Sequence, residues 1–361
     1  MIDRSEIRVI GLMSGTSLDG VDVAACGFVK VDGRWSLKLY GGKTLPYDAE
    51  MLSQLKDCHN FSARDLAVLN VRYGEYLGDI VDSFVKESGF EPQFVASHGY
   101  TVFHEPQNRM TMQIGSGAHI MAHCGLPVVC DFRTTDVALG GNGAPLVPIG
   151  DRLLFGDYSA CLNIGGFANV SYDEDGIRKA FDICPANIVL NGLARRIGLE
   201  FDVDGAMARR GTSDADLLAR LNSIGYYGQE PPKSLGREFV DSEILPLFGD
   251  DADVECLMST YAQHIAFQIS KVLNALTQGD VLVTGGGAYN TYLIDLLKER
   301  TKQNIVVPES TLVDLKEAMI FAFLGALRFC GEANCLKSVT GAKCDNIGGA
   351  MYGFGYPEKT F

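Results

Sequence analysis

The sequence predicts an α/β protein of two domains that share one plan. The chain has 361 residues, a length that suits two domains of about 150 to 200 residues each better than a single hydrophobic core. Hydrophobic residues make up 47% and charged residues 21% of the chain, as in folded proteins that bury a substantial core. The order of predicted elements in the first part returns in the second, which indicates an internal repeat.

The first copy of the repeat opens with strands and continues into a long helix. Apolar runs separated by polar or glycine-bearing turns predict three strands. Apolar residues at helical spacing then predict a helix over 63–87. Two short apolar runs, 93–97 and 127–131, are typical of buried strands in a mixed sheet. The three opening strands cover residues 8–13, 21–28 and 35–41.

The same order then returns. Three strands and a helix over 186–197 repeat the opening pattern, and a glycine-bearing turn joins the first two strands of each copy. Such a repeat indicates two related domains that face each other across a cleft, the ribonuclease H-like plan of actin, hexokinase and the chaperone ATPases. The repeated strands cover 159–164, 168–172 and 177–182, and the later elements are a helix over 254–275, a strand over 281–284, a helix after Gly287, a strand over 305–307 and a helix over 315–330.

The domain boundaries are expected in tight crossovers near residues 132 and 316, because no linker of low complexity interrupts the chain. The first domain then comprises residues 1–132 and 316–361, and the second comprises residues 133–315.

Charge and hydropathy exclude several classes of function. The formal net charge of −14 would repel nucleic acid and anionic membranes, so neither is an expected partner. No apolar run is long enough to cross a bilayer, and no signal-peptide core follows the first residues. The ten cysteines are scattered singly, without a CxxC pair. We therefore expect a cytoplasmic protein that acts on a small molecule, and a homodimer is compatible with these features.

Three glycine turns are candidates for holding a nucleotide. In the first, backbone N–H groups, two hydroxyls and the carboxylate of Asp19 could bind phosphate oxygens and a hydrated Mg²⁺. The second turn lies at the matching point of the repeat, and the third lets the backbone approach a base or sugar closely. The alternative for the first is a plain β-turn. Together the turns predict ATP and Mg²⁺ binding through Gly15, Thr16, Ser17, Leu18, Asp19, Gly20, Val21, Asp22, Asn163, Gly165, Gly166, Asn169, Gly285, Gly286 and Gly287.

Asp182 is the candidate catalytic residue. It ends the third strand of the second repeat, where its carboxylate would face the predicted cleft. Phosphoryl transfer needs a group that orients the nucleophile and accepts its proton, and a carboxylate serves as such a base. The alternative is that Asp182 caps the helix that begins near Ala186. Its place in the repeat favours the catalytic interpretation.

Polar residues of the first repeat and of the crossover are candidates for substrate binding. His98 lies where a strand meets a glycine turn, although a structural histidine is the alternative. Arg133 and Asp136 belong to a polar, glycine-rich segment that could be a hinge or a loop that carries the guanidinium towards a carboxylate. His98, Arg133 and Asp136 are therefore predicted to line the substrate site.

Nine short motifs carry a family resemblance. They are Gly11 to Asp22, Ser97 to Gly99, Asp131 to Arg133, Gly143 to Pro148, Asn163 to Gly166, Phe201 to Gly205, Pro231 to Ser234, Gly236 to Glu238 and Gly285 to Gly287. The set resembles the anhydro-N-acetylmuramic acid kinases over nearly the whole chain. The resemblance implies an enzyme that uses ATP and water to open 1,6-anhydro-N-acetylmuramic acid and phosphorylate O6 during peptidoglycan recycling. It also implies that Asp182 activates the water and that Glu317 lies near the sugar.

The chain departs from the family pattern beside the predicted base. Ile183, Cys184 and Ala186 stand where the family has a threonine and glycines, and Tyr100 and Leu235 replace a glutamine and a threonine. These changes keep a second hypothesis open, a kinase of another amino sugar. A third hypothesis is a non-catalytic ATP-binding regulator, which retention of Asp182 argues against, since a scaffold needs no base.

Overall fold

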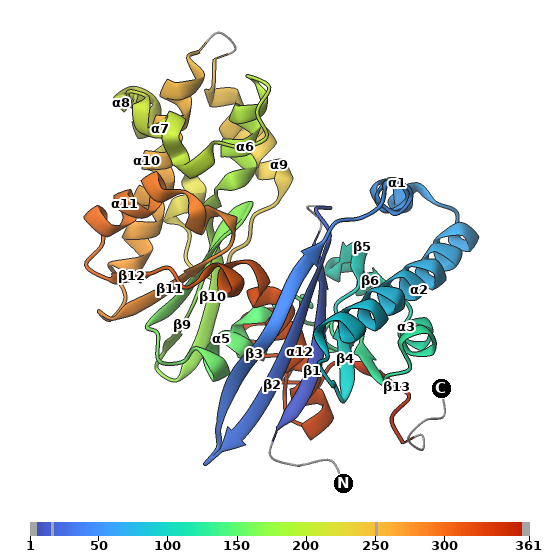
Figure 1. The fold of residues 1–361 in the computed structure, drawn as a ribbon. Helices are drawn as coiled ribbons and strands as arrows, with labels where there is room; N and C mark the ends of the chain where they lie inside the picture. The colour runs from blue at the N-terminus through green and yellow to red at the C-terminus, as the bar shows by residue number, and fades with distance from the viewer. Residues whose placement is uncertain (1–5, 16–17, 250–251, 356–361) are drawn as a thin grey trace. The chain divides into compact units, whose positions relative to one another are not determined.

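The computed structural model describes residues 6–15, 18–249 and 252–355, and Figure 1 shows its helices and strands. The chain divides into two compact units, Met1–Leu154 with Leu315–Phe361, and Phe155–Asp314. We call them unit 1 and unit 2. Residues 133–154 therefore belong to unit 1, whereas the sequence analysis places them in the second domain. The reason is tertiary: in this segment Gly150 packs against Ile320, and Asp151 pairs with Lys316 over 2.7 Å.

Unit 1 is built on a six-stranded sheet in the order β13-β7-β4-β1-β2-β3. The first three strands pair antiparallel in sequence order, β4 pairs parallel with β1, and β7 pairs parallel with β4. A separate antiparallel pair, β5 with β6, was not predicted from the sequence. The strands are β1 (Ile7–Ser14), β2 (Val21–Val31), β3 (Arg34–Leu45), β4 (Phe94–Ser97), β5 (Tyr100–Glu105), β6 (Met110–Ile114), β7 (Val128–Cys130) and β13 (Ala350–Tyr352).

The longest helix of unit 1, α2, begins and ends at recognisable signals. In the longest, Ser62 caps the first turn by accepting a hydrogen bond from the N–H of Asp65, and Gly89 ends the helix in the left-handed conformation. Its apolar face, from Leu66 to Phe84, packs into the core of the unit. The helices are α1 (Ala49–Asp57), α2 (Ala63–Ser88), α3 (Gly117–Cys124), α4 (Thr134–Ala138), α5 (Val147–Leu154), α13 (Lys337–Thr340) and α12 (Ser310–Cys330), which belongs to unit 1 from Leu315 onward.

Unit 2 is built on a five-stranded sheet in the order β10-β9-β8-β11-β12. Its core packs the sheet against α10, which is buried along most of its length. The strands are β8 (Ala160–Ile164), β9 (Phe167–Glu174), β10 (Ile177–Pro185), β11 (Asp280–Thr284) and β12 (Asn304–Val306). The helices are α6 (Asn187–Arg195), α7 (Ala206–Arg210), α8 (Ala215–Asn222), α9 (Arg237–Phe239), α10 (Val254–Leu273) and α11 (Thr291–Arg300).

Apart from β13, which only the sheet of unit 1 has, the two sheets share one topology, and this confirms the internal repeat and the two-domain α/β fold. In each unit an antiparallel meander is followed by two strands that add in parallel on the side of its first strand. The turn between β1 and β2 therefore corresponds to the turn between β8 and β9. By the same rule the end of β4, at Ser97, corresponds to the end of β11, at Thr284. The sequence analysis recognised the first correspondence and missed the second.

Among the described residues no helix combines the length and the apolar character that crossing a membrane requires.

Candidate functional site

Asp182 lies on β10, which is the edge strand of the sheet in unit 2. A β-bulge occurs at this point: Asp182 pairs with Asn169 of β9, Cys184 pairs with the next residue, Ala168, and Ile183 is extra. Ile183 and Cys184 are buried in the apolar core, whereas Asp182 is half-buried. The bulge thus leaves the carboxylate partly accessible at a sheet edge whose neighbouring residues point inward.

The segment that precedes α9 holds Asp182 in place. The backbone N–H of Leu235 donates to Oδ2 of Asp182 over 2.9 Å. The backbone N–H of Asp182 donates to the carbonyl of Lys233 over 3.2 Å, and the hydroxyl of Tyr226 donates to the Asp182 carbonyl over 2.7 Å. Helix α6 begins without a side-chain cap, so capping is not the role of Asp182. Because the contact from residue 235 comes from its backbone, a leucine serves there as well as a threonine.

Burial raises the pKa of Asp182 above the ordinary value of 3.8, and the hydrogen bond from Leu235 opposes that rise. A carboxylate with a raised pKa accepts a proton more readily than an ordinary one. The site can therefore act as a general base.

The second hairpin and the third glycine turn lie together in unit 2. The carbonyls of Gly165 and Gly166 accept hydrogen bonds from the N–H groups at the start of α6, including a 3.1 Å bond from Asn187. Gly285 has a φ of +81°, and a side chain there would collide with Asn163 at the end of β8. Gly286, in contrast, has space around it, with Asn187 the nearest group.

The glycines of the third turn therefore do two different things. Gly285 and Gly287 are required because the turn packs on the end of β8, at Asn163 and Ile164. Gly286 is the position where the backbone remains open to a ligand. Asn163 and Asn169 are paired across β8 and β9 beside this turn, and both are half-buried.

The first hairpin is described only in part, because Thr16 and Ser17 lie outside the described residues. Leu18 has a φ of +62° and donates its N–H to the carbonyl of Gly15 over 3.3 Å. Asp19 is exposed. After the turn the side chain of Val21 is fully buried, so that only its backbone can meet a ligand.

The two remaining predicted residues of this hairpin have structural contacts of their own. A side chain at Gly20 would meet the carbonyl of Leu45, which explains the glycine. Asp22 accepts a hydrogen bond of 2.6 Å from the Thr44 hydroxyl on β3.

A buried chain of hydroxyl groups supports the first hairpin, and the sequence analysis missed it. The Ser14 hydroxyl lies 2.5 Å from that of Tyr73 on α2, which in turn lies 3.0 Å from that of Tyr47. Burial raises the pKa of Tyr73 well above its ordinary value, so its hydroxyl stays protonated. The only signal in the sequence is a tyrosine on the apolar face of the predicted helix, which reads as an ordinary core residue.

His98 and Arg133 contact each other in unit 1. Nε of Arg133 donates to Nε2 of His98 over 3.0 Å, so the proton of the neutral ring is on Nδ1, which donates to the carbonyl of Gly99 over 2.8 Å. Burial and the charge of Arg133 lower the pKa of His98 well below its ordinary value. Arg133 also donates from Nη1 to the carbonyl of Gly143 over 2.7 Å. His98 is 4% exposed and orients the guanidinium.

Arg133 keeps both its charge and a donor for a ligand. Burial lowers its pKa to about 10, which still leaves the group protonated at neutral pH. Within residues 6–15, 18–249 and 252–355, no hydrogen bond engages its Nη2. The half-buried guanidinium is therefore held by its protein contacts through Nε and Nη1, with Nη2 available to an anionic group.

Glu317 lies on α12, close enough to Arg133 for their charges to interact. Burial raises its pKa, whereas the positive charges of Lys316 and Arg133 oppose the rise. Lys316 itself is buried and paired with Asp151. The structure thus brings together three of the four residues predicted for substrate binding, His98, Arg133 and Glu317.

Asp136, the fourth, is corrected to a structural role. Its carboxylate has no exposed surface. The N–H of Gly143 donates to Oδ2 over 2.8 Å, and Oδ1 accepts from the side chains of Cys335, Thr340 and Asn346. All its contacts are with residues of unit 1, so it fixes the loop that carries Arg133 and does not meet a substrate. A side chain at Gly141 would strike this carboxylate, which explains one glycine of the crossover.

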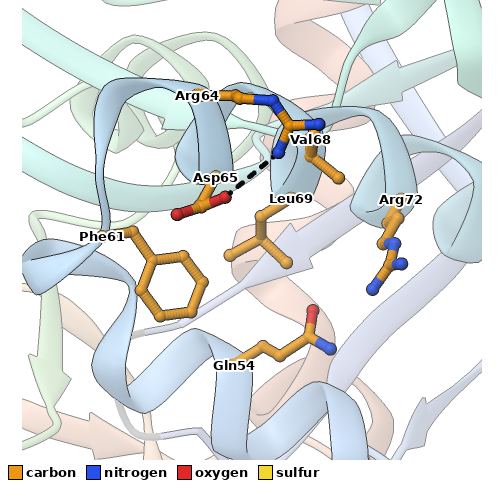
Figure 2. A pocket seen from close by; sticks show the side chains of 7 residues that line it. All are labelled: Gln54, Phe61, Arg64, Asp65, Val68, Leu69 and Arg72. Carbon is orange, nitrogen blue, oxygen red and sulfur yellow. Dashed lines mark ion pairs between the residues drawn. The ribbon is translucent and has the colours of Figure 1, made fainter.

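A pocket of about 460 Å³ opens between α1 and the first turns of α2 (Figure 2). It contains none of the residues predicted from the sequence. Both apolar and polar side chains line it: Gln54, Phe61, Arg64, Asp65, Val68, Leu69 and Arg72.

Comparison with known proteins identifies the family. Residues 7–354 match the family described as anhydro-N-acetylmuramic acid kinase. The chain is 32% identical to the anhydro-N-acetylmuramic acid kinase of Caldanaerobacter subterraneus subsp. tengcongensis, with 94% of this chain and 96% of that protein covered. It is 35% identical to that of Xanthomonas oryzae pv. oryzae, with 95% and 96% covered.

Among solved structures, it is similar to an activator of 2-hydroxyisocaproyl-CoA dehydratase from Clostridium difficile, at 15% identity and a TM-score of 0.42, with 90% of this chain and 97% of that chain covered. On the match over 7–354 and the identities above 30%, the chain belongs to the anhydro-N-acetylmuramic acid kinase family.

Proposed function

We propose that the protein is a cytoplasmic kinase that opens 1,6-anhydro-N-acetylmuramic acid with water and transfers the γ-phosphate of ATP to O6. The products are N-acetylmuramic acid 6-phosphate and ADP, and the reaction serves peptidoglycan recycling. Family membership supports the substrate, since the relatives carry this name. The observation that carries the chemistry is Asp182, a half-buried carboxylate with a raised pKa whose Oδ2 is anchored by Leu235.

In the proposed reaction Asp182 accepts a proton from a water molecule as the water oxygen attacks C1 of the sugar. The C1–O6 bond breaks, and its electron pair makes O6 a nucleophile. O6 then forms a bond to the γ-phosphorus as the bond from that phosphorus to the leaving oxygen of ADP breaks. Hydrolysis and phosphorylation are thus coupled through one oxygen. The protein orients the water, accepts its proton and holds the reactants in line.

We propose that the glycine turns bind the nucleotide. Backbone N–H groups of Gly15 and Gly166 would meet phosphate oxygens, whereas the N–H of Gly165 donates to the carbonyl of Phe167 over 3.1 Å. The open side of Gly286 would meet the adenosine. Asp19 and Asn163 complete these turns with polar side chains.

Mg²⁺ fits this arrangement, and Asp19 is the residue that would hold it. Within the described part of the chain, no group of three or more His, Cys, Asp or Glu side chains could form a metal cage. Mg²⁺ needs none, because it is commonly held by one or two carboxylates together with substrate phosphates. Asp19 is exposed on the phosphate hairpin, where a carboxylate suits that role. When bound, Mg²⁺ neutralises charge on the phosphates.

Arg133 and Glu317 are proposed to bind the sugar. Muramic acid carries a carboxylate on its lactyl group, and the available Nη2 of Arg133 is a suitable donor for it. Glu317 lies beside this guanidinium and would accept hydrogen bonds from sugar hydroxyls.

Three of the departures that keep a different amino sugar open lie in the core of unit 2. Ile183, Cys184 and Ala186 are each at most 2% exposed and belong to the core of unit 2. Their side chains therefore adjust internal packing and do not define a substrate pocket.

The test is a coupled ADP-release assay with ATP, Mg²⁺ and 1,6-anhydro-N-acetylmuramic acid. We expect sugar-dependent turnover that collapses in Asp182→Asn, with Asp173→Asn as the control on the neighbouring strand β9. Reducing N-acetylmuramic acid is the matched sugar, since it lacks the ring to be opened. ATP binding without turnover on either sugar would contradict the proposal and favour a non-catalytic regulator.

A further inference from the structure

A ten-residue segment, residues 226–235, crosses the free edge of β10 at Asp182. We call it the strap. Because β10 is the edge strand, its outward N–H and C=O groups have no strand partner, and at Asp182 the strap supplies both. The carbonyl of Lys233 accepts from the Asp182 N–H, and the hydroxyl of Tyr226 donates to the Asp182 carbonyl. The two ends of the strap thus hold the backbone of the same residue.

The strap also distinguishes the two carboxylate oxygens of Asp182. Oδ2 accepts the N–H of Leu235 over 2.9 Å. Among the described residues no hydrogen bond engages Oδ1. A carboxylate with one oxygen anchored cannot rotate freely about χ2, so the other oxygen keeps a fixed direction. Oδ1 is the oxygen that this geometry leaves to accept a proton.

Tyr226 is itself fixed by contacts within the strap. Nζ of Lys233 donates to the carbonyl of Tyr226 over 3.2 Å and lies 4.6 Å from the centre of its ring. The Tyr226 side chain is 8% exposed, and burial raises its pKa, so the hydroxyl stays protonated and remains a donor. The Lys233 contact closes the strap into a loop. The Tyr226 hydroxyl of this loop donates to the Asp182 carbonyl.

We infer that Tyr226 is a positioning residue for the proposed base: its hydroxyl and the strap hold Oδ2 of Asp182 on the Leu235 N–H so that Oδ1 faces the water. This inference rests on the proposed function for its effect on turnover. It concerns a residue that touches neither reactant, and it assigns a role to a segment whose family resemblance covers Pro231 to Ser234 but does not reach Tyr226.

Removing the hydroxyl has two expected effects. The Asp182 carbonyl loses a partner, which costs orientation of the base. We expect kcat to fall roughly tenfold, which corresponds to about 1.4 kcal/mol and lies at the upper end of what one hydrogen bond contributes. The strap also loosens, which weakens the bond from Leu235. Since that bond is the interaction that lowers the pKa of Asp182, the pKa should rise.

The experiment compares Tyr226→Phe with Tyr227→Phe, a matched control. The hydroxyl of Tyr227 is also buried but bonds to Nε2 of His264 over 3.0 Å, not to Asp182. We expect Tyr226→Phe to lower kcat about tenfold, to leave KM for the sugar within about twofold, and to move the acid limb of the kcat profile to higher pH. Tyr227→Phe should leave all three near the wild type. A loss of kcat that is equal at every pH would indicate a merely structural role and overturn the inference.

A second readout does not depend on turnover. The carboxyl of Asp182 can be titrated by NMR of protein labelled with ¹³C at the aspartate carboxyl, with Asp182→Asn identifying its signal. Tyr226→Phe should raise the pKa that this signal reports, and Lys233→Met should raise it in the same direction. An unchanged pKa in both variants overturns the inference even if the enzyme is active. A raised pKa together with no turnover on the sugar contradicts only the proposed function.

Discussion

Nε of Arg133 donates a 3.0 Å hydrogen bond to Nε2 of His98, although the two residues come from different loops of unit 1. The bond requires a neutral imidazole, and burial beside the guanidinium keeps the ring neutral. His98 therefore accepts a hydrogen bond that orients Arg133. This role differs from both roles considered from the sequence, substrate binding and plain structural support.

The first prediction concerns this pair. His98→Phe keeps the ring that packs 4.6 Å from Phe321 but removes the acceptor for Arg133. A hydrogen bond to a charged group is worth roughly 1.5–3 kcal/mol, so KM for the sugar should rise about tenfold or more, with a smaller change in kcat. Steady-state kinetics test this. His104→Phe, at an exposed ring bonded to Thr111, should leave KM unchanged; an equal effect of both variants would refute the assignment.

The second prediction concerns pH. The proposed base must be ionised to accept a proton, and burial raises the pKa of Asp182 above 3.8. Activity should therefore be lost, as pH falls, at a pH above that ordinary value. The measurement is kcat at saturating ATP and sugar across the acid range, with unfolding checked at each pH by circular dichroism. An acid limb at or below 3.8 in folded protein would contradict an Asp182 base.

The third prediction links Asp182 to stability. A carboxyl whose pKa is raised on folding costs stability at pH values above its folded pKa, and the cost disappears below its unfolded pKa. Asp182→Asn should therefore raise Tm at pH 7, since an amide oxygen can still accept the Leu235 N–H. Calorimetry at pH 7 and near pH 3.5 should show the gain shrinking at the lower pH. A lower Tm at pH 7 would show that the charge stabilises the fold.

The fourth prediction concerns Asp136. Asp136→Asn places an amide N–H₂ against one of the groups that donate to the carboxylate, either Gly143 N–H or the Oδ1 donors. A buried donor left without an acceptor costs about 1–3 kcal/mol, so the free energy of unfolding should fall by about that amount. Urea denaturation measures it. Asp131→Asn, at an exposed residue with a φ of +57° that asparagine tolerates, is the control and should have little effect.

The fifth prediction separates two neighbouring glycines. Gly285→Ala strains a residue with φ of +81° and pushes a methyl group into Asn163, so it should lower Tm. Gly286→Ala meets only Asn187 at van der Waals distance and should leave Tm nearly unchanged. If this turn meets the adenosine, Gly286→Ala should raise KM for ATP several-fold without affecting KM for the sugar. A normal KM for ATP would remove the turn from the proposed nucleotide site.

Patterns that depend on neighbouring residues could be predicted without the structure. The meanders, the long helices and the repeat follow from local apolar spacing, and the structure places β1 and β8 within one or two residues of the expected strands. The final helix is an exception: it begins at Ser310, five residues before the expected start at 315. Asp182 was identified as a candidate base because it ends the third strand of the second repeat.

The sequence by itself determined the two-domain α/β plan, the glycine turns and the identity of the proposed base, because each depends on the order and spacing of residues along the chain. Only the tertiary structure decided what these residues contact. The partner of Asp182 lies 53 residues away at Leu235, and the side chain of Asn346 reaches Asp136 across 210 residues. Such pairings arise when packing brings distant segments together, and they leave no periodic signal in the sequence. For that reason the sequence predicted Asp136 as a substrate-binding residue, whereas in the structure it is buried and supports the loop of Arg133.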